Sequence, residues 1–248
     1  MFGYNIENPS EWVVWFDLDD TLWDFSFNSK DTLREVYTHY RLDRFWSDCE
    51  QWISDYHSIN DPLWVEYANG TISSEHLRFK RFYDSFLLGG MNREEAGTIA
   101  NEADSFYLER LATRTRTTNG AHQLLERLTN RGFRLGILSN GFEKTQIKKL
   151  SSADLKKFFD FIVSSDTAGY NKPDPRIYRY AERLARVNAD SCIMIGDNVS
   201  TDIEGASNAG WPYAICYLGE KKEAPKKINE AFISGRLQFT KNLDEIEL

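Results

Sequence analysis

The sequence predicts an α/β protein in which a parallel-sheet core is interrupted by one all-helical insertion. Short apolar runs alternate with amphipathic helical patterns over residues 11–19 and about 130–218, and helical periodicity fills the interval between them. Strands that alternate with helices are typical of a parallel sheet with right-handed crossovers. We therefore expect a core formed by residues 1–22 and 115–248, with a helical insertion at residues 23–114.

The expected strands are apolar runs of six or seven residues that are rich in β-branched or aromatic side chains. Runs of this kind fit strands that are buried on both faces of a sheet. Most of them end in Gly, Ser, Asn or Asp. They are WVVWFDL (12–18), FRLGILS (133–139), FDFIVSS (159–165), CIMIGD (192–197) and YAICYL (213–218).

The helical patterns between these strands are amphipathic. Leu124, Leu125 and Leu128 share one stripe of a helix that closes at Gly132, a C-cap residue. Residues 236–248 predict a short last strand followed by a terminal helix.

The composition indicates an ordinary globular protein. Of 248 residues, 41% are hydrophobic and 27% are charged, which argues against disorder. No apolar run is long enough for a membrane span, and the N-terminus lacks the pattern of a signal peptide. Three scattered cysteines predict free thiols in a reducing cytoplasm. The net charge of −8 argues against nucleic-acid polymers as partners, because binding them needs Lys and Arg.

Carboxylates follow two of the predicted strands. Asp17 and Asp19 come at the end of the first strand, and Asp197 follows the strand at 192–196. In a parallel sheet, ligands bind at the carboxyl ends of the strands. Asp17 and Asp19 point to the same side while the chain stays extended, and they repel unless a cation lies between them. Asp17, Asp19 and Asp197 are therefore predicted to hold Mg²⁺, a cation that prefers oxygen ligands.

Two further strand ends predict a phosphate site. The strand at 133–139 runs into Ser139, Asn140 and Gly141, which offer a hydroxyl and backbone N–H groups at the start of a helix. Lys172 lies in a loop before Pro173 and supplies local positive charge to an acidic protein. The residues predicted to bind phosphate are Leu18, Ser139, Asn140 and Lys172.

These groups suit phosphoryl transfer. A carboxylate that attacks a phosphate dianion meets repulsion, which Mg²⁺ and Lys172 would neutralise. Asp17 is then the predicted nucleophile and forms an aspartyl-phosphate. Asp19 is the predicted acid and base, which protonates the leaving oxygen and later deprotonates the attacking water.

The order and spacing of these residues resemble the four motifs of the haloacid-dehalogenase-like (HAD) hydrolases. The matching residues are Asp17-Leu18-Asp19-Asp20-Thr21, Ser139, Lys172 and Gly196-Asp197 with Asp202. The resemblance implies a Rossmann-like core, a helical cap inserted between the first two motifs, and Mg²⁺ dependence. The dehalogenase branch of the family lacks an aspartate at the position of Asp19, so the resemblance implies a phosphatase.

A finer resemblance lies in the segments DDTLWDFSFNS, INDPLWVEYANGTI and LRFKRF. They are similar to bacterial pyrimidine 5′-nucleotidases that hydrolyse nucleoside monophosphates. The expected substrate is therefore a nucleoside 5′-monophosphate. The alternatives are a sugar phosphate or phosphoglycolate as substrate, a phosphomutase that uses the same aspartyl-phosphate, and an inactive scaffold that binds phosphorylated ligands.

Five residues around the motifs have two interpretations each. Thr21 either caps a turn or orients Asp17, and Asp202 either caps the helix at 203 or supports the site from behind. Trp23, Phe25 and Trp64 either pack in the core or line the substrate cavity.

Overall fold

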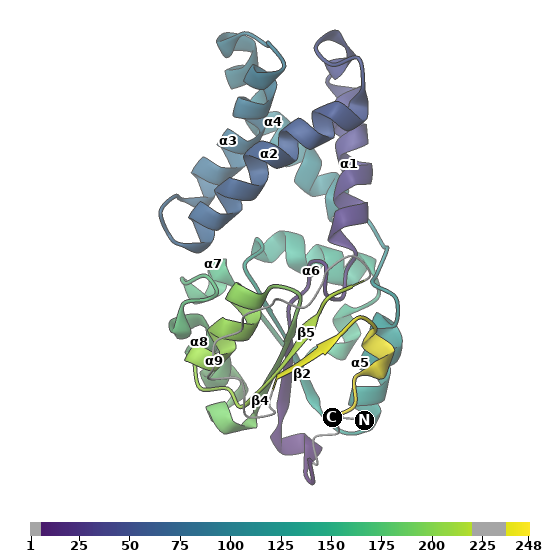
Figure 1. Ribbon diagram of the computed structural model, residues 1–248, viewed down its shortest axis with the longest axis vertical. Coiled ribbons are helices and arrows are strands. Elements are labelled where there is room, and N and C mark those ends of the chain that lie inside the picture. The colour runs from purple at the N-terminus through teal and green to yellow at the C-terminus, as the bar shows by residue number, and fades with distance from the viewer. Residues whose placement is uncertain (1–5, 220–236) are drawn as a thin grey trace. The chain divides into compact units, whose positions relative to one another are not determined.

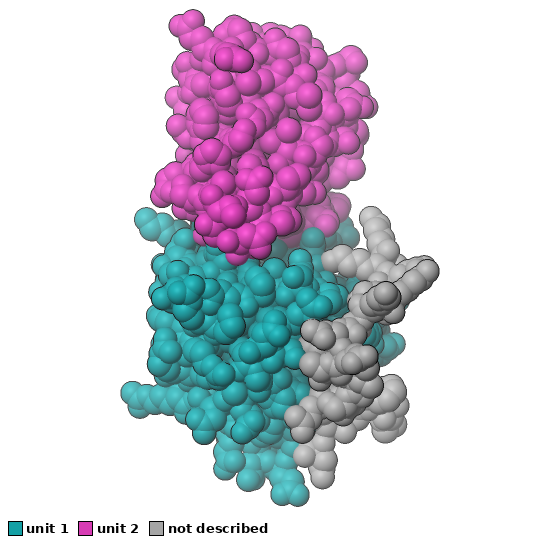
Figure 2. Space-filling view, turned by 60° about the vertical axis from the view of Figure 1, so that its left-hand side comes forward, with its two compact units in different colours: residues 1–24, 115–248 teal, residues 25–114 magenta. Residues whose placement is uncertain are grey.

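The computed structural model describes residues 6–219 and 237–248. The chain forms two compact units, one made of residues 1–24 and 115–248 and the other of residues 25–114 (Figure 2).

The first unit is built on a parallel sheet in which β1 is a central strand (Figure 1). Six strands of the described residues pair in the order β3-β2-β1-β4-β5-β6. Phe16 at the end of β1 lies opposite Ile137 of β2 and Ile195 of β4. The strands are β1 (Val13–Phe16), β2 (Arg134–Ser139), β3 (Phe161–Ser164), β4 (Cys192–Gly196), β5 (Tyr213–Tyr217) and β6 (Leu237–Thr240).

Helices cover both faces of this sheet, with α5 on one side and α8 and α9 on the other (Figure 1). Val13 and Trp15 of β1 point into the core on the α8 side, together with Ile177 and Tyr178 of α8. Side chains alternate along a strand, so the intervening residues Val14 and Phe16, also fully buried, face the other way. The helices are α5 (Ala121–Asn130), α6 (Glu143–Ser152), α7 (Ser165–Ala168), α8 (Pro175–Ala185) and α9 (Gly205–Asn208).

The second unit is helical. Three of its helices begin at a side-chain cap, in which Asp48, Ser73 or Asn92 accepts a hydrogen bond from the first turn. The fully buried Arg81 guanidinium pairs with Asp104 at 2.5 Å and links α3 to α4. The helices are α1 (Phe25–His39), α2 (Cys49–Ala68), α3 (Ser74–Leu88) and α4 (Arg93–Leu111).

The predicted fold class, a parallel α/β core with an all-helical insertion, is confirmed. The chain stays with the sheet unit up to residue 24, because Asp24 N–H donates to Arg116 and Thr118 N–H donates to Leu22. The predicted last strand is β6. The predicted terminal helix is wrong, since residues 243–245 form a single 3₁₀ turn.

The described segments 6–219 and 237–248 hold no helix with both the length and the apolar character needed to cross a bilayer.

Candidate active site

The sheet brings the polar ends of its central strands together. Asp17 directly follows β1, and its backbone N–H donates to the Ile195 oxygen of β4 at 2.9 Å. Asp197 directly follows β4, and Ser139 is the last residue of β2. The parallel strands therefore bring the carboxylates of Asp17 and Asp197 and the hydroxyl of Ser139 to one edge of the sheet.

Three carboxylates and one lysine form the centre of this edge. Oxygens of Asp17, Asp197 and Asp202 lie within 4.8 Å of one another. The Lys172 ammonium donates to Asp17 Oδ1 at 2.7 Å and to Asp202 Oδ1 at 2.6 Å. The Lys172 side chain is 2% exposed, so its charge is held away from water between the two acids.

The electrostatics of the cluster are dominated by burial. Burial raises the pKa of the Asp17 carboxyl well above its ordinary value, and Asp202, Asp197 and Asp19 raise it further against the opposing charge of Lys172. Burial would lower the pKa of Lys172, but Asp17 and Asp202 raise it above its ordinary value, so the ammonium stays charged. The cluster thus holds more negative charge than its lysine balances.

The donor set of this cluster fits a divalent cation. Asp17, Asp197 and Asp202 offer three carboxylates against one ammonium, a formal charge of −2 that a divalent ion neutralises. Carboxylate oxygens are the ligands that Mg²⁺ prefers. The predicted role of Asp19 as a metal ligand stays a prediction, because its carboxylate lies outside this group.

Asp202 is built into the site by a close approach to the sheet. Its Oδ2 accepts a hydrogen bond from Asn198 N–H at 3.0 Å, while its Oδ1 binds Lys172. A Cβ atom on Gly196 would lie 2.3 Å from Asp202 Oδ2, so any larger residue where β4 ends would displace this carboxylate. The hydrogen bond from Lys172 to Asp202 therefore supports the interpretation that Asp202 holds the site in place.

Two of the predicted phosphate residues, Ser139 and Asn140, are held by hydrogen bonds where β2 ends. Ser139 is buried, and its Oγ accepts hydrogen bonds from Gly141 N–H at 3.0 Å and from Gln146 at 2.7 Å. Both ends of the Asn140 amide bind the backbone of Lys172, at 2.7 and 2.9 Å. Asn140 thus fixes the loop that carries Lys172, and phosphate binding by Leu18, Ser139, Asn140 and Lys172 stays a prediction.

Asp19 has its own set of partners on α6. The Lys149 ammonium donates to Asp19 Oδ1 at 2.7 Å and to Oδ2 at 3.0 Å, and Gln146 Nε2 donates to Oδ2 at 3.0 Å. Sequence reasoning missed Lys149 and Gln146. Their spacing of three residues on the helix after Ser139 was the available signal, because such residues share one helix face.

A turn in the backbone directly after Leu18 explains why the carboxylates of Asp19 and Asp17 have different partners. The extended chain ends at Phe16, and the Leu18 carbonyl accepts hydrogen bonds from the N–H groups of residues 21, 22 and 23. The expectation that Asp17 and Asp19 point to the same side depends on an extended chain, and β1 ends at Phe16. The tight turn directs the Asp19 carboxylate to α6 while Asp17 keeps Lys172.

The remaining predicted residues differ in burial. Thr21 is fully buried, and its Oγ1 has no hydrogen-bond partner among the described residues, so its role in orienting Asp17 stays a prediction. Trp23 is also fully buried, and the Lys149 ammonium lies 4.6 Å from its ring centroid. Phe25 begins α1 in the helical unit, and Trp64 packs edge-on against Tyr67. A cavity role for Trp23, Phe25 and Trp64 stays a prediction.

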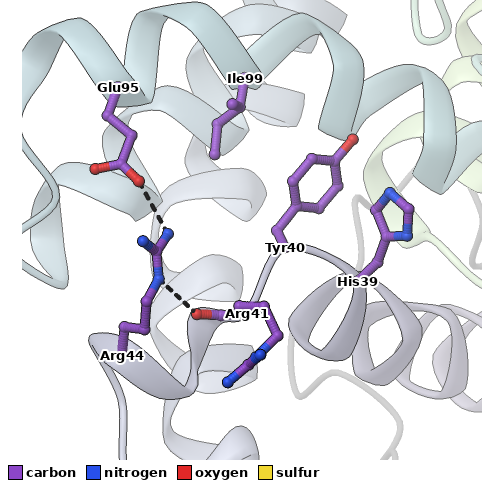
Figure 3. Close-up of a pocket in the computed structure, with 6 residues that line it drawn as sticks. All are labelled: His39, Tyr40, Arg41, Arg44, Glu95 and Ile99. Atoms are coloured by element: carbon purple, nitrogen blue, oxygen red, sulfur yellow. Dashed lines mark hydrogen bonds and ion pairs between the residues drawn. The ribbon is translucent and has the colours of Figure 1, made fainter.

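The helical unit has a surface pocket of about 470 Å³ that contains none of the predicted site residues. Its basic side chains are already engaged: Arg44 pairs with Glu95 at 2.9 Å and donates to the Arg41 oxygen (Figure 3), and Arg41 pairs with Asp43. We do not assign a ligand to it. Its lining residues are His39, Tyr40, Arg41, Arg44, Glu95 and Ile99.

Comparisons with known proteins identify the family of this chain. The sequence model described as haloacid dehalogenase-like hydrolase matches residues 13–210. Pyrimidine 5′-nucleotidase YjjG of Escherichia coli is 31% identical over 220 residues, which cover 88% of this chain and 90% of that protein. The glyceraldehyde 3-phosphate phosphatase of Pyrococcus furiosus is 29% identical over 205 residues, 80% of this chain and 77% of that protein.

A solved structure extends the comparison to the whole fold. The HAD hydrolase YfnB of Bacillus subtilis, solved bound to magnesium, matches with a TM-score of 0.79 and 24% identity, and the match covers 95% of this chain and 96% of that one. The sheet unit and the helical unit thus recur together in a known protein.

Proposed function

The chain belongs to the haloacid dehalogenase-like hydrolases, and on this premise we propose that it is a Mg²⁺-dependent phosphomonoester hydrolase that forms an aspartyl-phosphate on Asp17. The observation that carries the proposal is the buried contact of Lys172 with Asp17, at the point where β1 delivers that carboxylate beside Asp197 and Asp202. Sheet and helical units then act as catalytic core and cap.

The reaction proceeds in two displacements. The Asp17 carboxylate attacks phosphorus, so an O–P bond to Asp17 forms while the bond to the ester oxygen breaks. Asp19 gives its proton to the departing oxygen. Asp19 then takes a proton from water, the water oxygen attacks phosphorus, and the bond to Asp17 breaks to release phosphate.

Charge control in these steps comes from the cluster. Lys172 holds Asp17 Oδ1 and offsets the negative charge that builds up near the phosphoryl group. Asp17 and Asp197 would hold Mg²⁺, with Asp202 beside them and with a contribution from Asp19. The ion, when bound, supplies further positive charge for the phosphoryl oxygens.

The substrate is proposed to be a nucleoside 5′-monophosphate with a pyrimidine base. The support is the similarity to the pyrimidine 5′-nucleotidase of Escherichia coli, together with the residues of the segments DDTLWDFSFNS, INDPLWVEYANGTI and LRFKRF. A second candidate is a small sugar phosphate, which the likeness to a glyceraldehyde 3-phosphate phosphatase favours. Both are small phosphorylated metabolites, and a cytoplasmic location stays a prediction.

A phosphate-release screen tests the proposal. Purified protein is assayed on pyrimidine and purine nucleoside monophosphates, glyceraldehyde 3-phosphate and phosphoglycolate, with Mg²⁺ or with EDTA. We expect Mg²⁺-dependent release that is fastest with pyrimidine nucleotides, and no release by Asp17→Asn. Full activity in EDTA would contradict the metal, and a requirement for a bisphosphate activator would favour the phosphomutase.

A further inference from the structure

Asp19 is held by a buried lysine that the proposed chemistry has not used. The Lys149 side chain is 3% exposed, whereas the Asp19 carboxylate that it binds is 28% exposed. The ammonium contacts both carboxylate oxygens, at 2.7 and 3.0 Å. Burying an ammonium is costly unless a charged partner is fixed close to it, so Lys149 is placed in α6 to meet a carboxylate at this position.

Gln146 provides a third hydrogen bond to the Asp19 carboxylate. Its Nε2 donates both to Asp19 Oδ2 at 3.0 Å and to Ser139 Oγ at 2.7 Å. If the Gln146 amide were flipped, its oxygen would face the Asp19 carboxylate oxygen and the two would repel. The Nε2 group is therefore assigned as the donor to Asp19. A Cβ on Gly141 would lie 2.4 Å from Gln146 Nε2, which shows that the backbone makes room for this amide.

The far side of Lys149 is closed by an aromatic ring. Its ammonium lies 4.6 Å from the ring centroid of Trp23, a cation–π contact. Trp23 is itself fixed, because its N–H donates to the Leu18 oxygen and its own oxygen accepts from Asp20 N–H. The ring and the carboxylate therefore confine the ammonium to one place in the turn that carries Asp19.

From this geometry we infer that Lys149, assisted by Gln146, is a positioning residue for the acid and base Asp19. The inference rests on the proposed phosphatase function. A carboxylate on a turn has several rotamers, and proton transfer needs the donor aligned with the departing oxygen. Three hydrogen bonds from α6 remove that freedom, and Gln146 ties the alignment to Ser139, the predicted phosphate residue.

The role predicts a dependence on the leaving group. A nucleoside leaves as an alkoxide that needs the proton of Asp19, whereas p-nitrophenolate is stable as an anion and departs without one. The ratio kcat/KM covers the steps up to departure of the leaving group when that step is irreversible. Loss of Lys149 should therefore lower kcat/KM for the nucleotide much more than for p-nitrophenyl phosphate.

The first test compares Lys149→Met with Lys148→Met, which removes the same charge from an exposed position of the same helix. Lys149→Met should lower kcat/KM for a nucleoside 5′-monophosphate by about 100-fold, the lower end of acid–base contributions. For p-nitrophenyl phosphate the loss should stay under about threefold, and Lys149→Arg should restore part of the nucleotide activity. Lys148→Met should match wild type on both substrates.

A second test uses Asp19→Asn as background. If Lys149 acts through Asp19, adding Lys149→Met to Asp19→Asn should leave kcat/KM for p-nitrophenyl phosphate and the nucleotide unchanged within about twofold. Equal losses on both substrates, or additive losses in the double variant, overturn the inference. Should Lys149→Met fail to fold, Lys149→Arg and Gln146→Leu provide the same leaving-group comparison.

The two proposals fail in different ways. A wild-type protein that releases no phosphate from any substrate overturns the proposed function, and the inference with it. An active wild type that needs Asp17, in which Lys149→Met behaves like Lys148→Met, overturns the inference alone.

Discussion

Replacing Lys172 by methionine tests the electrostatics of the carboxylate cluster. The ammonium binds Asp17 at 2.7 Å and Asp202 at 2.6 Å, and both carboxylates are buried. Methionine keeps an unbranched chain in the same space, so the change removes charge with little loss of packing. What remains is a pair of buried acids without their cation.

The expected cost follows from that geometry. Breaking a buried ion pair by removing one partner destabilises a protein by about 3–5 kcal/mol, because the other charge stays buried and uncompensated. We expect Lys172→Met to lower the free energy of unfolding by that amount near neutral pH in EDTA. An exposed control on α6, Lys148→Met, should change it by less than about 0.5 kcal/mol.

The loss of stability in Lys172→Met should also depend on pH, and it should grow as the pH rises. The pKa of Asp17 is raised in the folded protein, chiefly by burial, and Lys172 is the neighbour that opposes the rise. Without the lysine the folded state binds the proton of Asp17 still more tightly than the unfolded state does. Stability of the variant therefore falls as pH rises from the ordinary aspartate range to the raised pKa, at up to about 1.4 kcal/mol per pH unit.

Urea unfolding, followed by circular dichroism at about pH 5 and about pH 8, measures both effects. The difference in free energy of unfolding between Lys172→Met and wild type should be larger at the higher pH than at the lower one. A gap below about 1 kcal/mol, or one that is the same at both pH values, would refute the reasoning, because buried uncompensated acids must respond to protons.

Three further changes are predicted. Asp17→Asn should abolish phosphate release and leave the melting temperature near that of wild type, and substantial turnover in this variant would contradict the nucleophile. Gly196→Ala should destabilise the protein by about 1–3 kcal/mol, because the new Cβ meets Asp202 Oδ2 at 2.3 Å; chemical denaturation measures this, and unchanged stability would show that the carboxylate moves aside freely. Arg81→Met in the helical unit should cost up to about 3 kcal/mol, because buried Asp104 loses Arg81 and keeps only the half-exposed Arg78 at 2.7 Å, and restored stability in a double variant with Asp104→Leu would identify the lost charge pairing as the cause.

The fold class and part of the site were predictable because the signals are local. An apolar run followed by polar residues marks a buried strand and its end, and alternation with helices indicates parallel pairing. Parallel strands share one carboxyl edge, so Asp17 and Asp197 could be placed together without coordinates. Lys172 followed from its position after a third strand, and the structure brings it to Asp17.

The same local signals could not place Asp19. Asp19 lies two positions after Asp17, and an extended chain would have kept both carboxylates on one side. The turn closed by the Leu18 carbonyl sends the Asp19 carboxylate to α6, and Asp202 takes the place beside Asp17 and Asp197. Turn geometry depends on packing around the loop, and sequence periodicity does not report it.

The sequence by itself therefore determined which residue types stand at the strand ends, and so the kind of chemistry that this edge can support. Only the tertiary structure decided how charges are paired there: Lys172 with Asp17 and Asp202, and Lys149 with Asp19. The physical reason is that the positions of strands and their ends follow from local patterns, whereas an ion pair depends on the direction and depth of side chains that lie 30 to 155 residues apart in the sequence. Those directions are fixed only when α6 and the loop before α8 pack against the sheet.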